Sequence, residues 1–234
     1  MFKQFGAGST VEVFDRPQHS SLTVAQSGQL EALVALEQIG ARRSFTRDDE
    51  VYTEGDLADC WYKVISGTVR ICKLMADGRR HIAEFFFAGE CFGLDDRGER
   101  LFSAEAVGDV IVMRFPRAAT QRLIEEKPEF ARHMCNMTLR SLAHAQTRML
   151  LLGRMTASER VASFLLELAE RRDVRRVIEV PMSRNDIADY LGLTIETVCR
   201  VLSGLKRDGA IATPSPHQIE LCDRDALEAV IVEA

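Results

Sequence analysis

Between residues 42 and 115 the chain carries short apolar segments that end at glycine or aspartate. Examples are residues 61–65, 68–72 and 83–87, and turn residues such as Ser66 and Gly67 separate them. The segments are rich in β-branched and aromatic residues, which is typical of strands. Many short strands at this spacing predict an antiparallel barrel or jelly roll.

Helical periodicity follows Pro116 and continues to about Arg154. Apolar residues recur there at intervals of three and four, which is the spacing of a coiled-coil seam. The seam consists of Cys135, Leu139, Leu142, Ala145, Met149 and Leu152. A second apolar strip consists of Met134, Met137 and Leu151. A helix packed only on its own barrel would explain one strip. Two strips favour a dimer, and we expect Met134 and the six seam residues to form its contact.

Two further helix starts show a hydroxyl residue followed by an acid three positions later, which is the capping-box pattern. They are Thr156 with Glu159 and Ser183 with Asp186. The second helix would bury Ile187, Tyr190 and Leu191. It would end at Gly192, since glycine accepts the positive φ of a tight turn, and Thr194 can cap the helix that comes next.

That next helix, from Ile195 to about Arg207, has two different faces. The apolar face consists of Val198, Val201, Leu202 and Leu205, and the opposite face of Ile195, Glu196, Cys199, Arg200 and Ser203. Two short helices joined by a glycine turn form a helix-turn-helix, whose second helix enters the major groove. Arginine can bind guanine there, and glutamate can accept from cytosine. The alternative is a solvent-facing ion pair between Glu196 and Arg200. Residues 210–212 and 218–221 flank a proline-containing turn and predict a two-stranded wing.

The net charge of −5 over 234 residues argues against a DNA-binding protein. Arg200, Lys206 and Arg207 gather at one helix end, however, so local clustering can neutralise phosphates.

No apolar run is long enough for a membrane span or a secretory signal, which predicts a cytoplasmic protein without a membrane partner. No nucleophile elbow, P-loop, HExxH or Rossmann motif is present, so we expect no enzymatic activity. None of the six cysteines forms a C-x-x-C pair, and we expect no metal site.

Residues 182–200 read MSRNDIADYLGLTIETVCR and resemble the signature of the FNR/FixK branch of the CRP/FNR superfamily. Residues 87–95, FAGECFGLD, are similar to the family's β-roll segment, and residues 146–152 and 158–162 to the junction between its dimer helix and its DNA-binding domain.

The resemblance implies an α+β chain with four parts. These are an N-terminal helical segment (1–40), a double-stranded β-helix or jelly roll like a cyclic-nucleotide-binding domain (41–117), a long dimerisation helix (118–154) and a winged helix-turn-helix domain (155–234). It also implies a homodimeric transcription regulator, expected to be an activator, with double-stranded DNA and RNA polymerase as partners.

In this branch, the residues matched by Glu196 and Arg200 read the TTG core of a TTGAT-type half-site, and the two reading helices lie one DNA turn apart. Expected DNA contacts are Ser183, Arg184, Thr194, Ile195, Glu196, Thr197, Cys199, Arg200, Ser203 and Lys206. The branch usually has serine at the position of Cys199. A thiol is a weaker hydrogen-bond partner, which puts the preference at the outer base pairs in question.

Three sensing chemistries can be compared with the sequence. Cyclic AMP sites of the superfamily use a glutamate after the G-x-x-x-G of the roll and an arginine before Ser-Ala, but Leu94 and Phe102 stand there. A buried phosphate would lack its cation. An FNR-type iron–sulfur cluster needs N-terminal cysteines, whereas the first cysteine is Cys60 and Met113 replaces the expected roll ligand.

Haem is the remaining alternative, with Cys72 or His81 as axial ligand. We expect no cofactor. A FixK-like regulator would then respond through its own abundance or through cysteine oxidation. Cys199 lies near a helix N-terminus and beside Arg200, surroundings that make a thiol reactive. Simple replacement of a serine is the competing interpretation. A different class is a cyclic-nucleotide or other small-ligand module that acts through protein partners.

Overall fold

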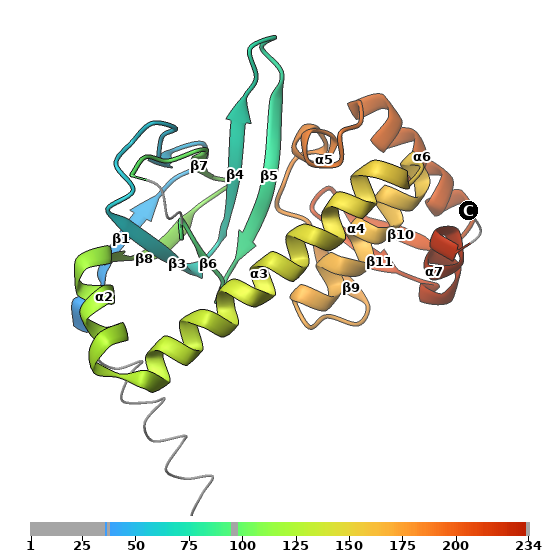
Figure 1. Ribbon diagram of the computed structural model, residues 1–234. Coiled ribbons are helices and arrows are strands. Elements are labelled where there is room, and N and C mark those ends of the chain that lie inside the picture. Colours follow the sequence, from blue (N-terminus) through green and yellow to red (C-terminus); the bar gives the residue numbers. More distant parts are fainter. Residues whose placement is uncertain (1–35, 37, 95–97, 233–234) are drawn as a thin grey trace, which may run out of the picture.

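The computed structural model describes residue 36 and residues 38–94 and 98–232 (Figure 1). Most of the predicted N-terminal helical segment (1–40) lies outside the described residues. The described chain forms a β-roll, a long helix that leads away from it, and a compact C-terminal domain.

The roll consists of two four-stranded antiparallel sheets, in the orders β1-β8-β3-β6 and β2-β7-β4-β5. Its strands are β1 (Ala41–Phe45), β2 (Glu50–Tyr52), β3 (Cys60–Ser66), β4 (Thr68–Leu74), β5 (Arg80–Phe87), β6 (Cys91–Phe92), β7 (Ser103–Ala106) and β8 (Val110–Pro116). Val64 and Val112 of one sheet share a buried cluster with Val69 and Ala104 of the other. The predicted jelly roll is confirmed.

The turn between β3 and β4 depends on glycine. Gly67 has φ +87°, and a Cβ on it would lie 2.3 Å from the carbonyl oxygen of Asp109. Only glycine combines this backbone conformation with such a close approach.

The helical region was predicted as one helix over residues 118–154, but the structure divides it into α2 (Arg117–Glu126) and α3 (Pro128–Arg154). Lys127 between them has extended backbone angles, φ −128° and ψ 96°. Proline disfavours the helical conformation of the residue before it, so Pro128 ends α2 and begins α3. The prediction of a single helix was wrong at this point.

The C-terminal domain has four helices and a three-stranded sheet of order β10-β11-β9. Its elements are α4 (Ala157–Arg171), β9 (Val177–Glu179), α5 (Arg184–Leu191), α6 (Ile195–Arg207), β10 (Ile211–Ser215), β11 (Gln218–Leu221) and α7 (Arg224–Val232). Both predicted capping boxes are present. The predicted wing is confirmed, and β9 adds a third strand to it.

The roll and the C-terminal domain share one apolar cluster. Phe85 and Phe87 of β5 are buried together with Phe164 of α4 and Tyr190 of α5. The ring centroids of Phe85 and Tyr190 lie 5.0 Å apart. The β4–β5 hairpin therefore packs against the first helix of the helix-turn-helix.

Candidate nucleic-acid interface

The exposed helix α6 is held in place by a turn and a buried apolar face. Gly192 ends α5 with φ +62°, and the side chain of Thr194 accepts a hydrogen bond from Thr197 N at 3.3 Å. Val198 is fully buried, and Leu202 and Leu205 are almost so, at 7% exposure each. The backbone of α6 is thus fixed from one side, which leaves the other side free for a ligand.

The outer face of α6 presents the predicted residues to solvent. Ile195, Glu196, Cys199, Arg200, Ser203 and Lys206 are all exposed. No ion pair joins Glu196 to Arg200 among the described residues, and Arg200 Nη2 instead contacts Thr197 Oγ1 at 3.4 Å. Hydrogen bonds to its own backbone N–H and to Thr194 lower the pKa of Glu196. The face therefore offers one carboxylate acceptor and one guanidinium with unused donors.

Three predicted DNA contacts also make hydrogen bonds within the protein. The hydroxyl of Ser183 accepts from Asp186 N at 3.1 Å and donates to its carboxylate at 2.8 Å, so it caps α5. Thr197, half-buried, contacts both Thr194 and Arg200. At the far end of α6, Lys206 Nζ donates to Thr213 Oγ1 of β10 at 3.0 Å. These contacts tie the reading face to the cap and to the wing.

Arg184, like Thr197, is half-buried, whereas the other predicted contacts are exposed. Burial lowers its pKa, and the charge of a nearby Cys199 thiolate would raise it. Its Nη1 is buried without a hydrogen-bond partner in the described part of the chain. Sequence spacing gave no sign that this arginine is partly buried.

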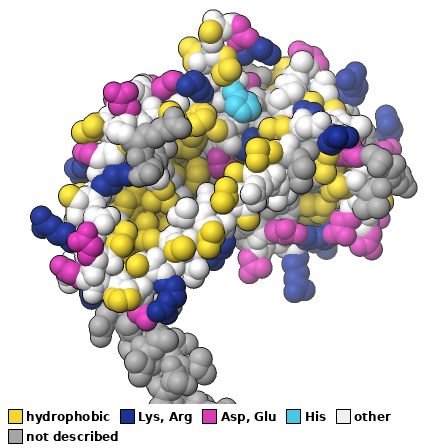
Figure 2. Space-filling model, viewed as in Figure 1, with side chains coloured by type: hydrophobic (Ala, Val, Ile, Leu, Met, Phe, Trp, Pro, Cys, Tyr) yellow, Lys and Arg dark blue, Asp and Glu magenta, His cyan; other side chains and the backbone are white. Residues whose placement is uncertain are grey.

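The seam on α3 is exposed. The exposed fractions are 58% for Leu139, 53% for Leu142 and 68% for Met149, and Cys135 and Ala145 are exposed too, whereas Leu152 is half-buried. Figure 2 shows hydrophobic side chains gathered along α3 and on the adjoining face of the roll.

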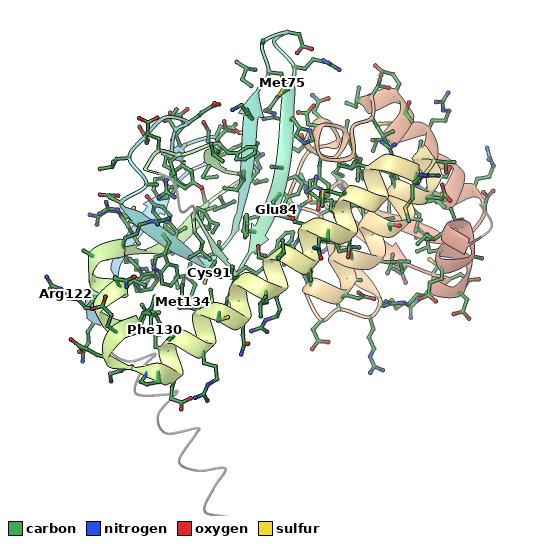
Figure 3. All side chains as sticks on the ribbon, in the orientation of Figure 1. Met75, Glu84, Cys91, Arg122, Phe130 and Met134 are labelled. Carbon is green, nitrogen blue, oxygen red and sulfur yellow. The ribbon has the colours of Figure 1, made fainter. Side chains whose placement is uncertain are left out.

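Met134 belongs to a different set than predicted. It was assigned to the dimer contact, but it packs, partly buried, on the cluster that contains Phe130 and Phe115 (Figure 3). The seam without Met134 is therefore the part of α3 that remains free for a partner.

Comparisons with known proteins support both halves of this architecture. Residues 42–127 match a cyclic nucleotide-binding domain, and residues 159–230 match a Crp-like helix-turn-helix domain. The nitrogen fixation regulation protein FixK of Bradyrhizobium diazoefficiens is 43% identical over 180 residues, which cover 75% of this chain and 76% of that protein. The chain belongs to the CRP/FNR family.

Other relatives carry regulator names too. The transcriptional activatory protein AadR of Rhodopseudomonas palustris is 36% identical over 83% of this chain and 82% of its own length. The solved structure of FixK2 from Bradyrhizobium japonicum matches with a TM-score of 0.80 and 41% identity, over 84% of this chain and 99% of that one. This CRP/FNR protein is accordingly a DNA-binding transcription regulator and not an enzyme.

The roll of this CRP/FNR protein holds an arginine that sequence analysis missed. Arg100 is buried at 2% exposure, and its Nη1 donates to the carbonyl of Gly93 at 2.8 Å. Its guanidinium lies 4.2 Å from the ring centroid of Tyr52. Arg100 thus links the glycine turn at Gly93 to the segment before Phe102. A charged residue in a turn-rich segment gave no local signal of burial.

The two residues considered for haem point to opposite sides of one sheet. Cys72 pairs with Ile82, and His81 with the neighbouring Lys73. Successive strand residues face opposite sides, so Cys72 and His81 do not converge. Cys72 is 3% exposed, and burial, with Glu105, raises the pKa of its thiol to about 12. A buried neutral thiol is a poor metal ligand.

Within the described residues, Glu84, His144 and Glu167 bring possible ligand atoms within 4.8 Å of one another. Arg171 already binds both carboxylates, at 2.9 and 3.2 Å. The arrangement is therefore an ion-pair network between β5, α3 and α4, and Figure 3 shows Glu84 on β5 beside α3. No helix in the described ranges is long and apolar enough to span a membrane.

Proposed function

We propose that the protein binds as a homodimer to a TTGAT-type palindrome and activates transcription there. The exposed Glu196 and Arg200 on α6, which form no ion pair with each other, carry this proposal. Both side chains project from the N-terminal half of the helix, which is the part that meets base edges in a helix-turn-helix. Arginine binds guanine O6 and N7 in a bidentate manner, and glutamate accepts from the cytosine amino group.

The exposed α3 seam supports a homodimer. Exposed leucines at coiled-coil spacing lose solvent contact when a second copy packs against them. The likeness to FixK2 over nearly the whole of that chain agrees with this arrangement. RNA polymerase is the expected partner of an activator bound upstream of a promoter.

We also propose that the roll binds no cyclic AMP, haem or iron–sulfur cluster. Arg100 occupies the turn region with its own guanidinium, and Phe102 stands where a phosphate-binding arginine would be needed. A small ligand sensed at the roll is the competing function. Calorimetric titration with cyclic AMP, cyclic di-GMP and fatty acids, and haem titration followed by absorbance, separates the two, because saturable binding of any of these overturns the proposal.

The proposal for the genes under control rests on the names of similar regulators. FixK is named for the regulation of nitrogen fixation and AadR as a transcriptional activatory protein. We propose control of low-oxygen respiration or nitrogen-oxide metabolism, and transcript profiling of a deletion strain under low oxygen tests it. No change in genes of these two classes would overturn this part.

The DNA target is tested by a gel shift at stated salt. The duplex TTGAT-N4-ATCAA should be bound at least a thousandfold more tightly than a scrambled duplex, about the smallest ratio typical of specific regulators. Insertion of five base pairs into the spacer turns one half-site to the opposite face of the DNA. Equal binding to the original and the lengthened duplex would contradict a dimer with fixed reading helices.

A redox role for Cys199 rests on its exposure on the outer face of α6. Peroxide would add bulk and charge to the reading face and weaken DNA binding. The matched variant Cys199→Ser should bind DNA with the same affinity before and after peroxide. If the parent protein keeps its affinity while mass spectrometry shows Cys199 oxidised, the redox role is wrong.

A further inference from the structure

The β4–β5 hairpin reaches the DNA-binding domain through a buried arginine. Only 8% of the Arg70 side chain is exposed. Its Nε donates to Glu105 Oε2 at 2.7 Å and its Nη2 to Asp48 Oδ1 at 2.8 Å, both within the roll. Its Nη1 contacts Asp186 Oδ1 of α5 at 3.3 Å. One guanidinium therefore bonds to three carboxylates and joins the two domains.

A second arginine of the hairpin reaches the same helix. Arg80 Nη2 donates to Asp186 Oδ1 at 2.5 Å, and its Nε donates to Asp189 Oδ2 at 2.9 Å. Asp186 and Asp189 lie one turn apart on α5, so Arg80 bonds to two successive acids along one helix face. The hairpin and α5 lie next to each other in Figure 1.

Asp186 divides its two carboxylate oxygens between two tasks. Oδ2 accepts from the backbone N and the hydroxyl of Ser183, at 2.9 and 2.8 Å, and so closes the capping box of α5. Oδ1 accepts from the two arginines of the hairpin. The residue that begins the helix-turn-helix is thus the residue that the roll holds.

Contacts that fix the position of α5 also fix the position of α6, because the two helices pack together. Ile187 and Leu191 of α5 share a buried cluster with Val198 and Leu202 of α6. The short turn at Gly192 links the two helices. A close-packed pair of this kind moves as one body, so the ion pairs on α5 determine how the reading helix is oriented relative to the roll.

We propose that Arg70, Arg80, Asp186 and Asp189 are positioning residues that hold the two reading helices of a dimer at the separation that a palindrome requires. The inference rests on the proposed function, since it assumes that two half-sites are read together. A geometry fixed in advance reduces the entropy lost when the second half-site is engaged. A single half-site gains nothing from it.

Arg80 and Asp189 give the cleanest test. Their side chains are 29% and 30% exposed, and the buried Asp186 keeps its contact with Arg70 when Arg80 is removed, so neither substitution leaves a deeply buried charge without a partner. The variants are Arg80→Ala, Asp189→Ala and the double variant. Arg79→Ala is the matched control, because this neighbouring hairpin arginine pairs only with Asp77 among the described residues and is 85% exposed. Thermal unfolding of each variant checks that it is folded.

Binding is measured by fluorescence anisotropy at fixed salt, on TTGAT-N4-ATCAA and on a duplex with one half-site. Arg80→Ala and Asp189→Ala should each weaken palindrome binding about tenfold and leave half-site binding unchanged. The double variant should be no weaker than Arg80→Ala, since the loss of Arg80 already removes the contact to Asp189. Arg79→Ala should bind both duplexes like the parent.

Two results overturn the inference. If Arg80→Ala and Asp189→Ala weaken binding to both duplexes by the same factor, the pair supports the fold of the domain and not its placement. If they weaken neither, the pair has no part in binding. The parent protein shows separately whether the proposed function holds, because a parent that binds palindrome and scrambled duplex equally fails before any variant is compared.

Discussion

Arg70 and Arg200 carry the same guanidinium in opposite surroundings. Arg70 is nearly buried and bonds to three carboxylates. Arg200 is exposed, and in the described part of the chain its one hydrogen bond is to Thr197. An arginine whose donors are satisfied inside the molecule holds the structure, whereas one with unused donors can bind a base edge. The domain junction therefore uses its charges for architecture, and α6 keeps its charges for DNA.

The largest effect is expected at the junction. Arg70→Ala removes one of the two cations that contact the buried Asp186 and the closest cation of the half-buried Glu105, which should cost about 3 kcal/mol in the free energy of unfolding. Arg79→Ala on the same hairpin should cause no measurable change, because Arg79 is exposed. Urea unfolding of both variants measures this. Equal stability of the two variants would contradict the structural role of Arg70.

The same contrast between a residue at the domain junction and one on α6 applies to carboxylates, and predicts how Glu84 and Glu196 affect stability as the pH changes. Burial opposes ionisation of Glu84, but His144, Arg171 and Arg148 outweigh it and lower the pKa of Glu84 from 4.5 to about 2. Because the pKa of Glu84 is lower in the folded state than in the unfolded state, its ionised carboxylate stabilises the fold above pH 4.5, and this stabilisation is lost as the pH falls towards 2. Glu84 thereby contributes about 3 kcal/mol to the free energy of unfolding at neutral pH.

Glu84→Gln should therefore flatten the fall in stability between pH 4.5 and pH 2, as measured by urea unfolding at several pH values. Glu196→Gln is the matched control on α6 and should follow the acid profile of the parent closely, since Glu196 is exposed. A Glu84→Gln profile as steep as that of the parent would show that this carboxylate is not stabilised in the folded state.

The next prediction concerns the exposed seam of α3, where a substitution should disrupt the dimer. Leu142→Lys introduces a charge at the seam and should raise the dissociation constant of the dimer about a hundredfold. Thr147→Lys introduces the same charge at an exposed position of α3 that is not three or four positions from any seam residue, and should leave the dimer intact. Sedimentation equilibrium distinguishes them. A monomeric parent would overturn the dimer proposal itself.

Local patterns predicted the elements well. The limits of α6, its buried residues Val198, Leu202 and Leu205, and both capping boxes follow from spacing within a few turns of chain. The break at Lys127 was also visible in the sequence, because Pro128 disfavours a helical residue before it, but the apolar seam concealed it. Met134 shows the limit of periodicity: the spacing predicts which residues share a helix face, but not whether that face packs on the same chain or on a second copy.

The junction could not be predicted in the same way. Arg70 and Asp186 are 116 positions apart in the chain, and neither stands in a pattern that indicates burial. The burial of Arg100 in the roll and of Arg184 Nη1 on α5 was likewise seen only in the folded chain. Ion pairs between distant elements depend on how the two domains pack together, and residue spacing within one element does not predict that packing. Exposed functional side chains are predictable because their helix alone determines where they point.

Base reading by Arg200 is the central claim, and one binding comparison tests it most directly. Arg200→Ala is measured on TTGAT-N4-ATCAA and on the same duplex with the guanine of each half-site replaced, with Arg207→Ala as the control. Arg200→Ala should cost about 1–3 kcal/mol of binding and lose discrimination at the guanine. Arg207→Ala should weaken both duplexes alike and keep discrimination. Arg200→Ala with the affinity and discrimination of the parent would contradict the account.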